Sequence, residues 1–306
     1  MPELVGIENA ISSNEAFHLK NFPESIIIIG GGYIATEFSS IFNGLGSQVT
    51  QVYRGNQILR GFDLDIRNAL SQEMQKKGIN FKFNENIIKI EESNHKKIVT
   101  LASNEVLEAD IVMFAVGRKP NIENLGLEKL GIKSGTKNQI IVDEWHRTNI
   151  ENIFAIGDVT DKINLTPVAL NEGICFAQTV FGGIKRKMDY RYIPSAVFSN
   201  PNLASVGLTE SDAKEKFERI DVYISNFTSL RHTLTGRNEQ TLLKVIVDNR
   251  SKVVLGIHMV GSEAGEIIQG LAVGIKMGML KDDLDATIGI HPTTAEEFVT
   301  MREKTR

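Results

Sequence analysis

Three small residues, Gly30, Gly32 and Ala35, form a Gly-x-Gly-x-x-Ala pattern of the kind that holds a pyrophosphate. The first glycine permits a tight turn, Gly32 lets the backbone approach phosphate oxygens, and Ala35 keeps a following helix close to the preceding strand. Four isoleucines precede the pattern and an amphipathic stretch follows it, so a strand would lead into a helix whose positive end faces the phosphates. The alternative is a glycine-rich turn in a generic α/β fold. The flanking elements favour a dinucleotide site.

Two arginines, Arg54 and Arg60, bear on which dinucleotide would bind. An NAD site usually carries an acidic residue about 20 positions beyond the glycines, where it binds the ribose 2′-hydroxyl. The corresponding residue here is Tyr53, which is neutral. Guanidinium groups bind phosphate oxygens in a bidentate manner and stay charged. The two arginines therefore favour the 2′-phosphate of NADPH, and the alternative is two solvent-facing arginines in a loop.

Two further segments carry residues that could bind a ligand or transfer a proton. Asp158 follows Gly157 at the end of an apolar run, and α/β proteins bind ligands at the carboxyl ends of strands. A turn or helix-capping aspartate explains the same pair equally well. His291 and Glu296 lie five residues apart, a separation that by itself establishes no catalytic pair.

The elements that would position these residues fall into three regions, which we expect to be domains at 1–120, 121–191 and 192–306. In the first region, the residue pattern predicts strands at 25–29 and 49–53, helices at 33–43 and 63–77, and strands at 79–83, 86–91, 97–101 and 110–116. The second predicts a strand at 153–156 and a helix at 167–181. The third predicts strands at 195–199, 203–206, 220–226, 242–247 and 253–260, with helices at 209–217, 263–278 and 293–303. The fold class is therefore α/β: a Rossmann-like unit with a β-meander, then an α+β domain with a mainly antiparallel sheet.

The composition is that of an ordinary globular protein, with 306 residues, 42% of them hydrophobic and 24% charged. The net charge of −4 provides no basic field for nucleic acid or an anionic membrane surface. No apolar run approaches the roughly 20 residues of a transmembrane helix, and no signal peptide is evident. The one cysteine, Cys175, rules out an intrachain disulfide and a multi-cysteine zinc site, and we expect it to be a packing residue. We expect no metal and a cytoplasmic location. Five other histidines lack ligand spacing and are expected to be structural or exposed: His18, His95, His146, His232 and His258.

Five segments together resemble the pyridine nucleotide–disulfide oxidoreductase family, in family order and across nearly the whole chain. They are Gly-Gly-Gly-Tyr-Ile-Ala-Thr-Glu-Phe at 30–38, Leu-Arg-Gly-Phe-Asp at 59–63, Phe-Ala-Val-Gly-Arg-Lys-Pro-Asn at 114–121, Thr-Asn-Ile-Glu-Asn-Ile-Phe-Ala-Ile-Gly-Asp at 148–158, and His-Pro-Thr-Thr-Ala-Glu-Glu-Phe at 291–298. The paired arginines and the 59–63 loop are most similar to the glutathione reductase branch.

The resemblance implies two cofactors, NADPH and FAD. Residues 1–120 would be the NADPH-binding domain, 121–191 the C-terminal part of the FAD-binding domain and 192–306 the dimerisation domain. Arg54 and Arg60 would hold the 2′-phosphate, Tyr33 would lie over the flavin until NADPH enters, and Glu37 would pair with a lysine of the flavin domain. Asp158 would bind a ribityl hydroxyl, and backbone groups of Thr166 would lie near the flavin pyrimidine. The motifs also include Ile34 beside the glycines, and Gly117 and Arg118 at the exit from the NADPH domain.

The resemblance also assigns an acid–base pair. Protonated His291 would deliver a proton to a leaving thiolate of glutathione disulfide, and Glu296 would bind the other imidazole nitrogen and fix its tautomer. The His291–Pro292 peptide bond is a candidate for the cis form. The family histidine serves the disulfide of the other subunit, which implies a homodimer, and Thr300 would lie near bound glutathione.

The sequence departs from the family in two elements. It contains neither the first Gly-x-Gly-x-x-Gly, which binds the ADP half of FAD, nor a Cys-x4-Cys redox pair. We therefore expect this chain alone not to reduce glutathione disulfide, and we expect apolar surface to be exposed within 116–185. Two alternatives remain open: another disulfide reductase similar to dihydrolipoamide dehydrogenase, which would prefer NAD, and a non-catalytic nucleotide-binding and dimerisation module.

Overall fold

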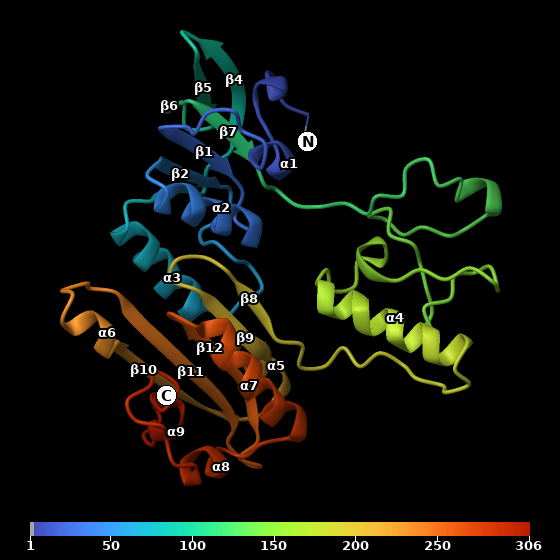
Figure 1. Cartoon of the computed structure of the whole chain (residues 1–306), viewed down its shortest axis with the longest axis vertical. Coiled ribbons are helices and arrows are strands. Elements are labelled where there is room, and N and C mark those ends of the chain that lie inside the picture. The colour runs from blue at the N-terminus through green and yellow to red at the C-terminus, as the bar shows by residue number, and fades with distance from the viewer. Residues whose placement is uncertain (1–2) are drawn as a thin grey trace. The chain divides into compact units, whose positions relative to one another are not determined.

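The computed structural model describes residues 3–306, which form two compact units (Figure 1). One unit joins the chain up to Val116 with residues Arg191–Arg306, and the other is Gly117–Tyr190. The expected division into three domains stays a prediction.

A four-stranded parallel sheet forms the nucleus of the first unit, in the order β3-β2-β1-β7. Its strands are β1 (Ser25–Ile29), β2 (Gln48–Tyr53), β3 (Asn80–Phe83) and β7 (Ile111–Phe114). Helix α2 (Tyr33–Gly44) connects β1 to β2, and α3 (Leu64–Lys76) connects β2 to β3. The expected β-α-β-α-β unit is confirmed. Asp63 begins α3 as expected, because its Oδ1 accepts from the Asp65 amide at 3.0 Å.

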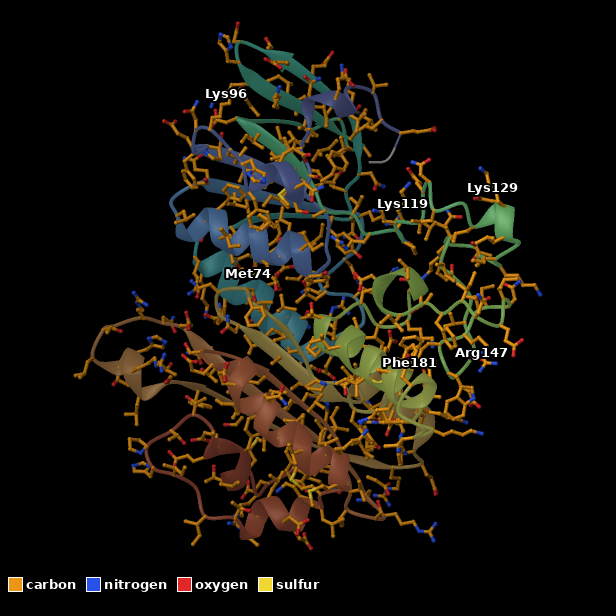
Figure 2. All side chains as sticks on the ribbon, turned by 45° about the vertical axis from the view of Figure 1, so that its right-hand side comes forward. Met74, Lys96, Lys119, Lys129, Arg147 and Phe181 are labelled. Carbon is orange, nitrogen blue, oxygen red and sulfur yellow. The ribbon has the colours of Figure 1, made fainter. Side chains whose placement is uncertain are left out.

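The four isoleucines of β1 explain why this strand is apolar throughout. Side chains alternate across a strand, and both faces of this sheet are covered. Ile26 and Ile28 pack with the apolar side chains of α2 and α3, among them Met74 (Figure 2). Ile27 and Ile29 pack instead with residues of the antiparallel meander β4 (Ile87–Ser93), β5 (Lys96–Leu101) and β6 (Val106–Ala109). Burial on both faces therefore fixes β1 and the turn that follows it.

The rest of this unit is built on a five-stranded antiparallel sheet in the order β10-β11-β12-β9-β8. The strands are β8 (Ser195–Val197), β9 (Leu203–Gly207), β10 (Ile220–Thr228), β11 (Gln240–Asp248) and β12 (Val254–Val260). Helix α7 (Ala264–Met277) packs on the sheet, and shorter helices are α1 (Ser13–Ala16), α5 (Glu210–Lys216), α6 (Leu230–Thr233), α8 (Lys281–Ala286) and α9 (Glu297–Thr300). Val197, Leu203 and Val260 enter the same apolar cluster as Ile26, so the two sheets share one core.

The second unit has one long helix, α4 (Thr166–Val180), beside irregular chain with 3-10 turns at Glu128–Leu130 and Gly157–Thr160. Its small apolar cluster includes Ile132, Ile140 and Ala155. Apolar side chains are exposed within it as expected, among them Leu170 and Ile174. Phe181, which is labelled in Figure 2, is exposed as well.

Two expected elements are wrong. No strand forms at 153–156, where one bridge joins Phe154 to Arg147 and the apolar side chains pack into the unit's cluster instead. The helix expected at 293–303 is reduced to α9, because hydroxyl and carboxylate bonds shape residues 293–296 and the chain after Met301 pairs with Val222 of β10.

Candidate functional site

The turn between β1 and α2 contains three glycines in different surroundings. Gly30 has φ of +143°, and a Cβ there would lie 2.3 Å from the Ala115 carbonyl oxygen. A Cβ on Gly31 would lie 2.5 Å from the Tyr53 ring. Gly32, in contrast, is exposed and a Cβ would meet no atom within 4 Å. The first two glycines are required by the fold, whereas Gly32 leaves space above the backbone for a ligand.

The N-terminus of α2 opens onto that space. Gly32 is the N-cap residue, no side chain accepts from the first-turn amides, and no acidic residue lies in the first turn. Unpaired amides and the helix dipole give this end a partial positive charge, which suits a phosphate. Ala35 is fully buried and Ile34 is half-buried, so the helix lies close to the sheet, while Tyr33 is exposed.

Arg54 and Arg60 are both exposed and lie on one loop between β2 and α3. Buried Leu59 ties the loop to the glycine turn, because its amide donates to the Gly31 carbonyl at 2.6 Å. Arg67 of α3 holds the middle of the loop by donating to the carbonyls of Ile58 and Gln57, at 2.6 and 3.0 Å. Two exposed cationic side chains therefore extend from a backbone that is fixed beside the glycine turn.

Gln51 holds the glycine turn in place, a role that was not predicted from the sequence. It is fully buried on β2, and its Nε2 donates to the Gly30 carbonyl at 2.9 Å. Ser39 of α2 donates to its Oε1 at 3.0 Å. The strand, the turn and the helix are thus joined by one buried amide, and the available signal was a polar residue inside an apolar strand.

Glu37 is half-buried on α2, and its Oε1 accepts from the Phe198 amide at 2.8 Å. Burial raises the pKa of this carboxyl. Its partner among the described residues is thus a backbone amide, and the expected pairing with a lysine of a flavin domain stays a prediction.

His291 and Glu296 lie together before α9. The imidazole Nδ1 is 3.1 Å from Glu296 Oε1, and the His291–Pro292 peptide bond is cis as expected. The Thr293 amide also donates to Oε1, at 3.1 Å, and orients the carboxylate. The histidine side chain is 78% exposed and the glutamate side chain 17%. A carboxylate at Nδ1 favours the tautomer with its proton there, which leaves Nε2 directed away from the pair to exchange a proton. Thr300 is exposed at the end of α9.

The remaining site residues belong to the second unit and are described within it. Gly117, with φ of +135°, and exposed Arg118 begin the unit. Asp158 is exposed in the turn Gly157–Thr160, and Thr166 is exposed at the first residue of α4. The Gly157 amide donates to Glu172 at 2.6 Å, which holds the turn against α4, and the next residue, Asp158, is exposed.

Cys175 is buried in α4, in agreement with a packing role. Within residues 3–306, no group of three or more histidine, cysteine, aspartate or glutamate side chains could hold a metal ion. Over the same residues, no helix has the length and apolarity needed to span a bilayer.

Comparison with known families gives the class of protein. Residues 2–173 match the model of the pyridine nucleotide-disulphide oxidoreductases, and residues 193–302 match the model of their dimerisation domain. The chain belongs to the pyridine nucleotide-disulphide oxidoreductase family, as the five motifs predicted.

Individual relatives narrow the class. A glutathione reductase from Nostoc sp. is 46% identical over 98% of this chain and 69% of its own length. A trypanothione reductase from Trypanosoma congolense is 44% identical over 99% of this chain and 62% of its own length. Among solved structures, the HOCl-induced flavoprotein disulfide reductase RclA from Escherichia coli matches with a TM-score of 0.91 and 28% identity, over 97% of this chain and 69% of that one. The expected fold class is confirmed by the structure and by these matches.

Proposed function

We propose that this chain is the NADPH-binding and dimerisation portion of a glutathione reductase. The observation that carries the proposal is the space above Gly32, which the amino end of α2 faces and beside which the Arg54–Arg60 loop is fixed. The pyrophosphate of NADPH would bind at the helix amides, and the two guanidiniums would bind its 2′-phosphate. When bound, NADPH supplies a hydride.

The pair of His291 and Glu296 supports acid–base work on a thiol. Glu296 would hold the imidazole by Nδ1, and Nε2 would deliver a proton to the thiolate that leaves glutathione disulfide. In a homodimer of the whole reductase, this histidine would act on the redox disulfide of the other subunit, and Thr300 would contact glutathione. The match to the dimerisation domain supports the homodimer.

The second cofactor, FAD, would supply two-electron redox chemistry between NADPH and a disulfide. In the second unit, the exposed Asp158 and Thr166 are the residues that would contact it. Gly117 and Arg118 belong to the segment that joins the NADPH-binding residues to this unit.

Because the chain has one cysteine, which is buried, it holds no redox disulfide of its own. We expect the polypeptide alone to bind NADPH without reducing glutathione disulfide. Formation of glutathione by the purified chain in the presence of NADPH would contradict this expectation.

Coenzyme preference separates the proposal from a protein similar to dihydrolipoamide dehydrogenase. The experiment measures Kd for NADPH and NADH with the wild-type chain and with the Arg54→Gln/Arg60→Gln variant. We expect the wild type to prefer NADPH by at least about tenfold, since each lost charge-assisted hydrogen bond costs about 1.5–3 kcal/mol. The variant should lose the preference and keep its NADH affinity. A preference of the wild type for NADH would favour the NAD-dependent alternative, and equal affinity for both coenzymes or no binding of either would contradict the proposal.

A further inference from the structure

A cluster of five charged side chains joins α3 to the five-stranded sheet. At its centre Lys244 of β11 is 1% exposed, and its Nζ donates to both oxygens of Asp63, at 2.8 and 2.9 Å. It also donates to Asp65 at 2.6 Å and to Glu210 at 2.7 Å. Arg306 pairs with Asp65 and Glu210 from the other side, at 2.6 and 2.5 Å. We call these five residues the Lys244 cluster.

Buried charged side chains are unusual between two packed elements, where apolar side chains are the rule. Lys244 has apolar buried neighbours on its strand, Leu243 and Val245. Desolvation of a charge is costly, and apolar residues of similar size often stabilise such a position at least as well. Stability alone is therefore a weak reason for the cluster, whereas fixing the position of one particular group is an attested use of buried charge.

The group that the cluster fixes is Asp63, the residue that ends the Arg54–Arg60 loop. Asp63 is 1% exposed and receives the Glu210 amide at 2.9 Å in addition to Lys244. It lies three positions after Arg60, with two residues between them. The Phe62 amide donates to the Leu59 carbonyl at 3.0 Å, and the Leu59 amide donates to Gly31. The buried ammonium is therefore linked to the glycine turn by the Lys244–Asp63 bonds, the backbone from Asp63 to Leu59 and the two backbone hydrogen bonds of the loop.

We propose that Lys244 is a positioning residue for coenzyme discrimination: by holding Asp63 it fixes the end of the loop that carries Arg60, and so sets where the 2′-phosphate is bound. The proposal rests on the proposed function, in which Arg60 binds that phosphate. Lys244 itself contacts no coenzyme and acts through Asp63.

The other end of α3 offers a matched control. Lys77, the C-cap residue, also reaches across to the sheet region and donates to Glu239 and Asn200. Lys77→Met removes a second lysine that joins α3 to the chain beside the five-stranded sheet, at the end of α3 away from the Arg54–Arg60 loop. Any general loosening of α3 against the sheet affects both variants, whereas loss of loop position affects only Lys244→Met.

The experiment compares wild type, Lys244→Met, Asp63→Asn and Lys77→Met as full chains. Calorimetry gives Kd for NADPH and NADH, and hydrogen exchange gives the protection of the Leu59 and Phe62 amides without coenzyme. Asp63→Asn keeps the shape of the side chain and an oxygen that can accept from the Asp65 amide at the start of α3. This variant therefore tests the proposal if Lys244→Met does not fold. We expect Lys244→Met and Asp63→Asn to lose about tenfold of the NADPH preference and to expose both amides, with Lys77→Met unchanged.

Two results would overturn the proposal. One is retention of both the NADPH preference and the amide protection in folded Lys244→Met or Asp63→Asn, which would leave the cluster a purely stabilising role. The other is an equal loss in Lys77→Met. If wild type shows no preference for NADPH, the proposed function fails, and the amide protection still decides whether Lys244 positions the loop.

Discussion

The two glycines at the ends of the Gly-x-Gly pair should respond to alanine in opposite ways. Gly30→Ala places a methyl group 2.3 Å from the Ala115 carbonyl oxygen at a residue with φ of +143°. Gly32→Ala places one where no atom lies within 4 Å, at an ordinary φ of −86°. The first change therefore perturbs the fold, and the second perturbs only a ligand that occupies the open space.

The size of each effect follows from these contacts. Overpacking costs about 1–3 kcal/mol and a strained backbone a similar amount, so Gly30→Ala should lower the free energy of unfolding by about 2–5 kcal/mol. Gly32→Ala loses a favoured N-cap residue but reduces the freedom of the unfolded chain, so its net effect should stay within about 1 kcal/mol. Its methyl group should nevertheless weaken NADPH binding at least about tenfold, because the backbone can no longer approach the pyrophosphate.

Chemical denaturation measures the first quantity and calorimetric titration with NADPH the second, on the same preparations. The Gly31→Ala variant is a further control, since its methyl group would meet the Tyr53 ring at 2.5 Å and should also destabilise the fold. The reasoning is refuted if Gly32→Ala binds NADPH as tightly as wild type, or if Gly30→Ala is as stable as wild type.

Three other features give separate predictions. Ile28 of β1 is fully buried against α2 and α3, so Ile28→Ala should lower the free energy of unfolding by about 2–5 kcal/mol, measured by chemical denaturation. A decrease below about 1 kcal/mol would contradict the described core. Burial lowers the pKa of His258, whose Nε2 is hydrogen-bonded to the Leu208 carbonyl. As the pH falls below about 6.5, this histidine is protonated in the unfolded chain before it is protonated in the folded chain. The free energy of unfolding should therefore decrease, by up to about 1.4 kcal/mol per pH unit. His258→Gln should show a shallower slope, and an identical slope would contradict the assignment. Cys175 is buried, so a thiol reagent should label it slowly in the native chain and fast in denaturant, and fast native labelling would contradict its packing.

The glycine turn between β1 and α2 could be predicted because the residues that form it are close together in the sequence. A buried strand, a glycine pattern and an amphipathic helix follow one another within residues 25–44, and each element has its own periodicity. The cap at Asp63 was recognised for the same reason. The roles assigned to Arg54 and Arg60 stay predictions.

The contacts that hold the site together were out of reach of the sequence. Lys244 meets Asp63 across 181 positions and Glu210 across 34, and no local pattern marks such a pair. The expected strand at 153–156 was wrong because a short apolar run can be buried in a small hydrophobic cluster without pairing with another strand. The helix at 293–303 was too long because Thr293 and Glu296 use their side chains locally and the following chain pairs with β10.

Binding of 2′,5′-ADP, compared with 5′-AMP on the same chain, tests the central claim most directly, because the two ligands differ at the 2′-phosphate and neither needs a flavin or a disulfide. We predict that 2′,5′-ADP binds at least about tenfold more tightly and that replacing Arg54 and Arg60 removes the difference. Equal binding of the two ligands by the wild-type chain would contradict the account.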